Sequence, residues 1–258
     1  MKQLKAPVIS NIEALPDIYL MWLEAPEIAA TAKPGQFVMV RCGGDTTLPR
    51  PFSIHRIDDR QLAFLFKVVG KGTNRLSQVK KGDTLNIFGP LGNGFNINAG
   101  SRNILLVAGG MGIAPLYFLA EAAAGTGKKV TLINGARTRD SLLPVSLPQK
   151  FYEKGLPPVG VNVVTATEDG SEGFRGLATQ LVPHYLKGID QVFACGPAAM
   201  YESMAKMPEL KNKDVQLSLE IMMGCGVGVC YGCTIKTRSG LKQVCKDGPV
   251  FQLGDIVF

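Results

Sequence analysis

The chain has 258 residues, and its 28 Lys and Arg against 21 Asp and Glu give a formal net charge of +7. With 46% hydrophobic and 19% charged residues, the composition is that of a packed globular protein and excludes a mainly disordered chain. The length fits one large or two modest domains, and the dispersed Lys and Arg residues do not form the clustered basic face that nucleic-acid binding needs.

Residues 1–98 predict a series of short β-strands. Apolar and β-branched runs occupy residues 8–26, 37–42, 52–57 and 62–70. Turn signals such as Asp58-Asp59 separate these runs. Several strands at this spacing indicate a β-barrel or a sandwich.

The pattern changes near residue 98. Compact apolar runs at residues 103–107, 129–133, 161–165 and 191–194 predict strands, and an Ala- and Leu-rich run at 115–124 predicts a helix. A further helix is expected to begin near Pro197. Strands that alternate with helices indicate a doubly wound parallel sheet, covered on both faces. A last strand from Val215 leads into a cysteine-rich tail.

Nothing in the sequence predicts export or membrane insertion. The long uncharged stretch at residues 104–120 is interrupted by glycines and by Pro115, and it is shorter than the ~20 residues of a membrane-spanning helix. The first residues lack the apolar core of a signal peptide. We therefore expect a cytoplasmic protein without a membrane or nucleic-acid partner, whose cysteines serve as metal ligands or reactive thiols.

Four of the six cysteines stand close together in the tail. Cys225, Cys230, Cys233 and Cys245 have the spacing C-x4-C-x2-C-x11-C, with glycines between them that permit a tight wrap. The spacing of the first three cysteines matches the plant-type [2Fe–2S] pattern. Structural zinc sites usually take two short-spaced pairs, so the spacing favours an iron–sulfur cluster over zinc. We interpret Cys42 as an ordinary residue at a strand end.

Several turns have the composition of phosphate sites. Residues 105–115 read as a strand, a glycine turn and a helix start, which places N–H groups where a pyrophosphate can rest, although the glycines do not follow G-x-G-x-x-G. A tight turn that only packs the helix against the strand, and binds no ligand, would have the same sequence pattern. In the run RPFS at 50–53, the arginine can bind a phosphate with its forked guanidinium, or the run is a plain β-turn. The run GKGT at 70–73 can bind an anion through successive backbone N–H groups, or it is a hairpin loop. Cys195-Gly196-Pro197 ends a strand at the sheet edge where ligands bind.

Taken in order, RPFS, GKGT, GPLGNGF at 89–95, AGGMGIAPL, ACGP and the cysteine run resemble the ferredoxin-NADP reductase superfamily with a cluster appended. More narrowly, E-x3-G-C-G-x-G-x-C-Y-G-C followed by V-C-x-D-G-P-V-F is similar to the electron-transfer subunits of NAD-dependent dihydroorotate dehydrogenases of type B. The resemblance implies an FAD-binding β-barrel at residues 1–98, an NAD-binding α/β domain at 99–214 and a [2Fe–2S]-binding tail at 215–258.

The resemblance also implies the site residues. The expected FAD contacts are Arg50, Pro51, Phe52, Ser53, Leu65, Phe66, Lys67, Gly72 and Thr73. The expected NAD contacts are Gly109, Gly110, Gly112, Cys195, Gly196 and Pro197. The expected cluster ligands are Cys225, Cys230, Cys233 and Cys245. Phe52 departs from the isoleucine that is frequent in this family, which alters a packing contact rather than chemistry.

The implied reaction is hydride transfer between flavin and nicotinamide, coupled to single electrons through the cluster, with no catalytic side chain. A separate FMN subunit would oxidise dihydroorotate in pyrimidine synthesis, in a heterotetramer with two copies of each chain. The alternatives are the flavin subunit of a sulfide dehydrogenase or of an NADH-dependent ferredoxin:NADP⁺ oxidoreductase, and a zinc-stabilised binding module. Because of Arg137 and Arg139, NADP remains an alternative to NAD as the nucleotide. We interpret His55 as a strand side chain near RPFS and His184 as a helix-surface residue.

Overall fold

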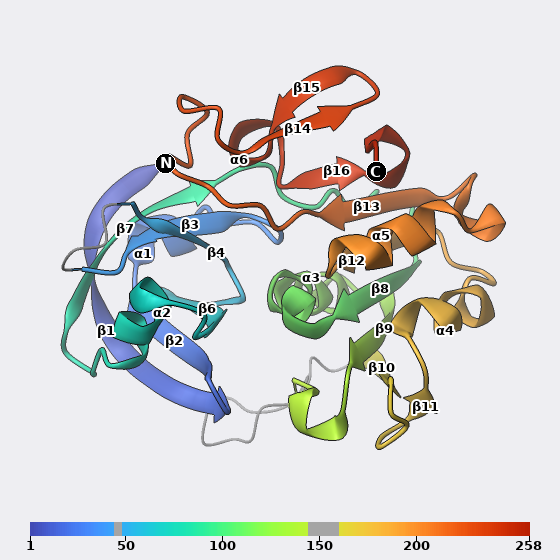
Figure 1. Cartoon of the computed structure of the whole chain (residues 1–258), viewed down its shortest axis with the longest axis horizontal. Coiled ribbons are helices and arrows are strands. Elements are labelled where there is room, and N and C mark those ends of the chain that lie inside the picture. Colours follow the sequence, from blue (N-terminus) through green and yellow to red (C-terminus); the bar gives the residue numbers. More distant parts are fainter. Residues whose placement is uncertain (44–47, 144–159) are drawn as a thin grey trace.

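The structure is a computed structural model that describes residues 1–43, 48–143 and 160–258. Its N-terminal part is a curled antiparallel sheet with the strand order β4-β3-β7-β1-β2-β6-β5, which confirms the expected all-β region (Figure 1). The strands are β1 (Lys2–Leu15), β2 (Ile18–Glu24), β3 (Phe37–Arg41), β4 (Arg50–Ser53), β5 (Arg56–Asp58), β6 (Gln61–Lys67) and β7 (Thr84–Leu91). Two short helices, α1 (Pro26–Ala29) and α2 (Lys71–Ser77), lie between them.

Side-chain alternation along these strands builds the barrel core. In β6, Leu62, Phe64 and Phe66 point into a buried cluster inside the curled sheet, whereas Ala63 and Leu65 belong to a second cluster on the other face. Phe52 of β4 stacks on Phe64 with a centroid distance of 4.8 Å. Both faces of β6 are thus buried, because the second domain covers the outer one.

The second sheet has the strand order β11-β10-β9-β8-β12-β13-β16, and all its pairs are parallel except β13–β16. Its strands are β8 (Asn103–Gly109), β9 (Lys129–Ala136), β10 (Val161–Thr167), β11 (Phe174–Arg175), β12 (Gln191–Cys195), β13 (Asp214–Ser218) and β16 (Val250–Gln252). Helix α3 (Ile113–Gly125) covers one face, and α4 (Ala178–Tyr185) and α5 (Ala198–Ala205) cover the other (Figure 1). The doubly wound sheet is therefore confirmed.

The tail contributes strands to the parallel sheet and is hydrogen-bonded to the end of the barrel. Strand β13, which begins one residue before the segment 215–258 expected as a separate tail, and β16 within that segment belong to the parallel sheet. Between them, the cysteine loop, the hairpin β14 (Thr234–Thr237) and β15 (Gly240–Gln243), and the short helix α6 (Val244–Asp247) form a unit above both domains (Figure 1). Asn93, which follows β7, donates its N–H to the carbonyl of Gly248 at 2.6 Å. Strand pairing over long sequence distances thus decides where the tail lies.

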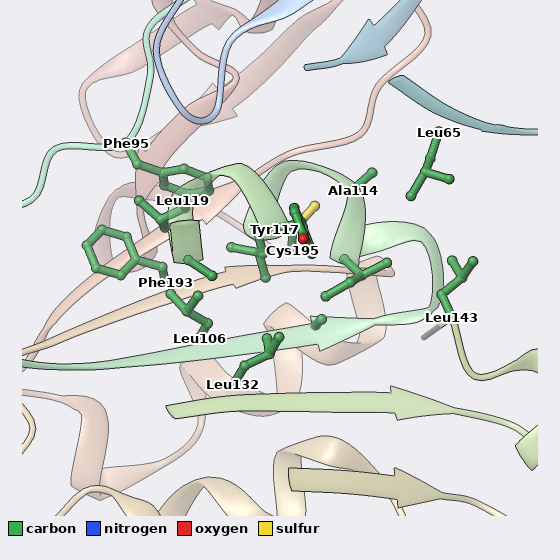
Figure 2. Close-up of a cluster of buried hydrophobic side chains, with 14 of the residues drawn as sticks. Leu65, Phe95, Leu106, Ala114, Tyr117, Leu119, Leu132, Leu143, Phe193 and Cys195 are labelled. Atoms are coloured by element: carbon green, nitrogen blue, oxygen red, sulfur yellow. The ribbon is translucent and has the colours of Figure 1, made fainter. Parts of the chain in front are cut away.

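The interface between the two domains is an apolar layer around α3. Figure 2 shows Leu65 of the barrel beside Ala114, and Phe193 on the sheet below α3, whereas Tyr117 of α3 packs on His55 of the barrel. Among the described residues, no helix has the length and apolar character to cross a membrane.

Candidate functional site

The motif RPFS forms the whole of β4, at one end of the curled sheet. All four residues are half-buried. Arg50 donates from Nη1 to the Leu48 carbonyl at 2.9 Å, which orients the guanidinium. A Cβ placed on Gly72 would lie 3.7 Å from Arg50 Nε, so the structure brings together the RPFS and GKGT motifs. The guanidinium therefore lies beside the first turn of α2.

The GKGT motif starts a helix rather than forming a hairpin loop, because Gly70 precedes α2. Thr73 Oγ1 accepts hydrogen bonds from the N–H groups of Val69 at 2.9 Å and Gly70 at 3.2 Å. This arrangement fixes the start of the helix, and the first-turn N–H groups of a helix have no partner within it. An arginine beside such a turn has the chemistry of a phosphate site, which fits the pyrophosphate of FAD.

The three expected β6 residues have different surroundings. Phe66 is buried in the barrel core and stacks on Tyr19 at 5.4 Å, so only its backbone can contact a cofactor. Leu65 lies in the interface layer beside Ala114 (Figure 2). Lys67 is exposed. The strand therefore offers backbone groups and an apolar side chain rather than catalytic groups.

The glycine turn and the ACGP turn meet at the carboxyl edge of neighbouring parallel strands. Strand β8 ends at Gly109 and β12 ends at Cys195, with Ala108 and Cys195 in register. A Cβ on Gly112 would overlap the carbonyl oxygen of Cys195, so this position requires glycine. The chain winds outward from β8 in both directions here, which is the switch point where open α/β sheets bind nucleotides.

A hollow of about 390 Å³ opens beside this switch point. Gly196 and Pro197 line it from the parallel sheet, and Ile235 and Lys236 line it from the β14–β15 hairpin. The site residues expected from the sequence include Gly196 and Pro197 but none of the hairpin residues. Hairpin and turn are 39 residues apart in the chain, counted from Gly196 to Ile235, and no local pattern joins them.

Tyr201 and Glu220 are two residues that the sequence-based site prediction missed. Tyr201 accepts the N–H of Gly196 at 2.8 Å and donates to the Ser218 carbonyl at 2.6 Å, which holds the ACGP turn in place. Glu220 Oε1 lies 3.8 Å from Cys195 Sγ. Although part of the Glu220 side chain is exposed, burial of its carboxyl group raises the pKa. Burial and the nearby Glu220 also raise the pKa of Cys195, which keeps this thiol protonated.

In the tail, backbone N–H groups point at the cysteine sulfurs. Gly228 donates to Cys245 Sγ at 3.1 Å, Cys245 to Cys233 Sγ at 3.4 Å and Val227 to Cys225 Sγ at 3.5 Å. Gly226 and Gly228 have φ of 74° and 80°, conformations that side chains rarely adopt. Burial raises the pKa of Cys225, but backbone donors outweigh it and lower the pKa to about 6. Burial and the neighbouring Cys233 instead raise the pKa of Cys245 to about 12. Backbone N–H groups that point at cysteine sulfurs fit an iron–sulfur cluster.

Cys225 contacts Cys230, and Cys245 contacts Cys233 and also lies near enough to Cys225 for the two thiols to interact. Within the described parts of the chain, no three His, Cys, Asp or Glu side chains converge as they would around one metal ion. A structural zinc ion takes four ligands around a single point. A [2Fe–2S] cluster spreads its four thiolates over two iron atoms, which fits the contacts of Cys225 with Cys230 and of Cys233 with Cys245.

The cluster loop packs directly against the barrel. Cys233 and Cys245 share a buried cluster with Phe37 and Met39 of β3. Met39 is the register partner of Pro51 in β4, so a single strand separates the cysteine loop from the RPFS motif. The cysteine loop packs on β3, and the RPFS motif is the neighbouring strand β4. The two candidate cofactor sites are therefore close together, which suits electron transfer between them.

Of the two histidines, only His184 has the expected position, exposed on α4. The expectation that His55 is a strand side chain is wrong, because His55 lies between β4 and β5 and is buried in the domain interface. Its ring packs against Tyr117 with a centroid distance of 4.7 Å. Cys42 is buried directly after β3, as expected for an ordinary strand-end residue.

Comparison with protein families gives two matches. The family described as "Iron-sulfur cluster binding domain of dihydroorotate dehydrogenase B" matches residues 220–257, and the "Oxidoreductase NAD-binding domain" family matches residues 106–206. These ranges contain the cysteine loop and the glycine turn, respectively.

Two curated relatives are named "Dihydroorotate dehydrogenase B (NAD(+)), electron transfer subunit". The one from Caldanaerobacter subterraneus subsp. tengcongensis is 38% identical, with 99% of each chain covered. The one from Desulforamulus reducens is 39% identical, with 100% of this chain and 99% of the relative covered.

Solved structures show the same fold. An NADH-dependent reduced ferredoxin-NADP oxidoreductase is 29% identical over 98% of this chain and 89% of that chain, with a TM-score of 0.83. The ferredoxin reductase of carbazole 1,9a-dioxygenase is 22% identical over 84% of this chain and 68% of that chain, with a TM-score of 0.70.

Proposed function

This chain belongs to the family of electron transfer subunits of NAD-dependent dihydroorotate dehydrogenase B, and we propose that it carries electrons from a dihydroorotate-oxidising FMN subunit to NAD⁺. The cofactors are FAD, a [2Fe–2S] cluster and NAD. When bound, FAD exchanges an electron pair with NAD and single electrons with the cluster. The observation that carries the proposal is the adjacency of the cysteine loop and the RPFS strand, through Met39 and Pro51.

The residues of this chain position and insulate these groups. Cys225, Cys230, Cys233 and Cys245 hold the cluster at the tail. Arg50, Gly72 and Thr73 hold the FAD pyrophosphate, with Pro51, Phe52, Ser53, Leu65, Phe66 and Lys67 along the flavin. Gly109, Gly110, Gly112, Cys195, Gly196 and Pro197 line the NAD site at the switch point. The three units are the barrel at residues 1–98, the NAD-binding domain at 99–214 and the cluster-binding segment at 215–258, although β13 and β16 of that segment complete the parallel sheet.

The outer side of the cysteine loop is apolar and supports a docking role. Met222 is 90% exposed, Val229 71% and Tyr231 70%. We call these three residues the apolar rim. Cys230, between Val229 and Tyr231, is itself exposed, which places one ligand of the cluster at the surface. Exposed apolar side chains around a redox centre suit a protein partner that must approach the cluster closely, here the FMN subunit.

Co-purification tests this function. The full chain, expressed with a dihydroorotate-oxidising FMN subunit, should elute with that subunit as a complex of two copies of each chain, measured by light scattering. The complex should reduce NAD⁺ with dihydroorotate, whereas the FMN subunit alone should not. If the chain instead binds a ferredoxin and ignores the FMN subunit, the proposed partner is wrong.

A further inference from the structure

The side chain of Gln243 is buried beside the cysteines of the tail, and its Nε2 has no hydrogen-bond partner among the residues that the structure describes. Gln243 is the last residue of β15 and directly precedes α6, which carries Cys245. Across the hairpin it pairs with Thr234, the residue after Cys233. Gln243 therefore stands between two of the expected cluster ligands.

The backbone of Gln243 has its own partner, so the side chain is not needed to hold the turn. The Gln243 N–H donates to Asp247 Oδ2 at 2.7 Å, and the following N–H, that of Val244, donates to the Cys233 carbonyl at 3.1 Å. These two bonds fix the corner at which β15 becomes α6. The side-chain carboxamide of Gln243 takes no part in either of these hydrogen bonds.

The carboxamide lies against the loop that donates to the sulfurs. A Cβ on Gly228 would come within 2.9 Å of Gln243 Oε1, and the Gly228 N–H donates to Cys245 Sγ at 3.1 Å. Gln243 is 8% exposed, and its Nε2 has no hydrogen-bond partner in the described polypeptide. Leaving a buried N–H donor unpaired costs about 1–3 kcal/mol, so such a group in a native protein calls for a partner.

An iron–sulfur cluster supplies the acceptor that this donor lacks, because its sulfurs and thiolates carry negative charge. N–H donors to these sulfurs stabilise the reduced cluster, which holds one more electron, and so raise its potential. We propose that the Gln243 carboxamide donates its Nε2–H to a sulfur of the cluster and sets the potential at which this subunit accepts electrons. Gln243 is a positioning and tuning residue, not a ligand. The inference rests on the proposed [2Fe–2S] site.

The test is a redox titration of the anaerobically purified full chain, followed by electron paramagnetic resonance of the reduced cluster. Gln243→Met keeps the length of the side chain and removes the donor. Gln243→Glu keeps its shape and replaces the donor by an oxygen acceptor. Gln252→Met makes the same change at an exposed glutamine of β16, whose Nε2 donates to Asp214, and serves as the matched control.

Gln243→Met should retain iron and sulfide at the wild-type content, and its cluster should be about tenfold harder to reduce, a shift of about 59 mV for a one-electron couple. Gln243→Glu should shift the potential further in the same direction. Gln252→Met and the FAD potential should not change. A Gln243 variant that keeps its cluster at the wild-type potential contradicts the proposal. Loss of the cluster in both variants also contradicts it, because Gln243 would then serve folding. A wild-type chain without any cluster would overturn the proposed site itself.

Discussion

The Nδ1–H of His55 donates to the carbonyl oxygen of Ala114 at 3.0 Å, and this bond joins the barrel to the first turn of α3. A carbonyl can only accept, so the proton of the neutral ring must be on Nδ1. Burial lowers the pKa of His55 to about 4. The domain interface therefore contains a neutral histidine that resists protonation.

This pKa predicts a loss of stability in acid. Between pH 6.5 and 4 the unfolded chain binds a proton at His55 and the folded chain does not, so stability falls as the pH falls. The contribution between pH 7.5 and pH 5 is about 2 kcal/mol. Thermal unfolding with FAD in excess should show a smaller acid loss for His55→Asn, whose Nδ2 can still donate to Ala114. The exposed His184→Asn should behave as wild type, and equal acid sensitivity in all three proteins would refute the assignment.

Gly112→Ala should destabilise the NAD-binding domain, since its new Cβ would overlap the carbonyl oxygen of Cys195, a backbone atom that cannot rotate away. The expected cost is about 1–3 kcal/mol in the free energy of unfolding, together with weaker binding of NADH. Gly125→Ala, at the other end of α3 with open space around it, should be neutral or slightly stabilising. Denaturant unfolding and NADH titration measure both effects. Wild-type NADH affinity in Gly112→Ala would count against this turn as the NAD site.

Cys230→Ser should abolish the cluster signal while FAD stays bound. Because Cys230 is exposed, the substitution removes a ligand without opening a cavity in the core. Cys42→Ser changes a buried cysteine that is no ligand, and it should keep the full iron content. Iron and sulfide analysis together with the flavin absorbance distinguish the two variants. Equal loss of iron and flavin in Cys230→Ser would mean that the tail serves folding rather than ligation.

Arg50→Gln should weaken FAD binding by tenfold or more, as expected when a charge-assisted hydrogen bond to phosphate is lost. The exposed Arg60, which pairs with Glu24 at 2.9 Å, provides the control variant Arg60→Gln. Flavin retained after gel filtration and its affinity on reconstitution are the readouts. Undiminished FAD affinity in Arg50→Gln would remove Arg50 from the site.

Met222→Asp should raise the Kd for the FMN subunit about tenfold, equivalent to about 1.4 kcal/mol, because it places a charge in the apolar rim. Leu177→Asp, an exposed leucine next to α4, should leave the Kd unchanged. Calorimetric titration of the two subunits gives both values, and the iron content of each variant confirms that its cluster is intact. A Kd equal to that of wild type in Met222→Asp would exclude the rim as the docking surface.

Local patterns were enough to predict the elements whose shape depends on neighbouring residues. The parallel strands and α3 follow from apolar runs and glycine turns, and the cysteine spacing limits what the tail can bind, because three thiols within nine residues must wrap a small object. The short helices α1, α2 and α6 were missed. Their few residues carry no period of their own, and α2 begins through the Thr73 hydroxyl and the backbone of Val69 and Gly70.

Contacts between distant segments needed the tertiary structure. His55 meets Ala114 across 59 residues, and the carboxylate of Glu220 lies near the thiol of Cys195 only because β13 pairs with β12. Likewise, the hairpin that buries Gln243 beside Gly228 brings to the cysteine loop an N–H donor that has no partner in the described parts of the chain. Residue types and spacing specify which chemistry a chain can perform. Strand register and domain packing decide which groups face one another, and therefore their pKa values and hydrogen-bond partners. Register and packing in turn depend on the burial of residues that are far apart in the sequence.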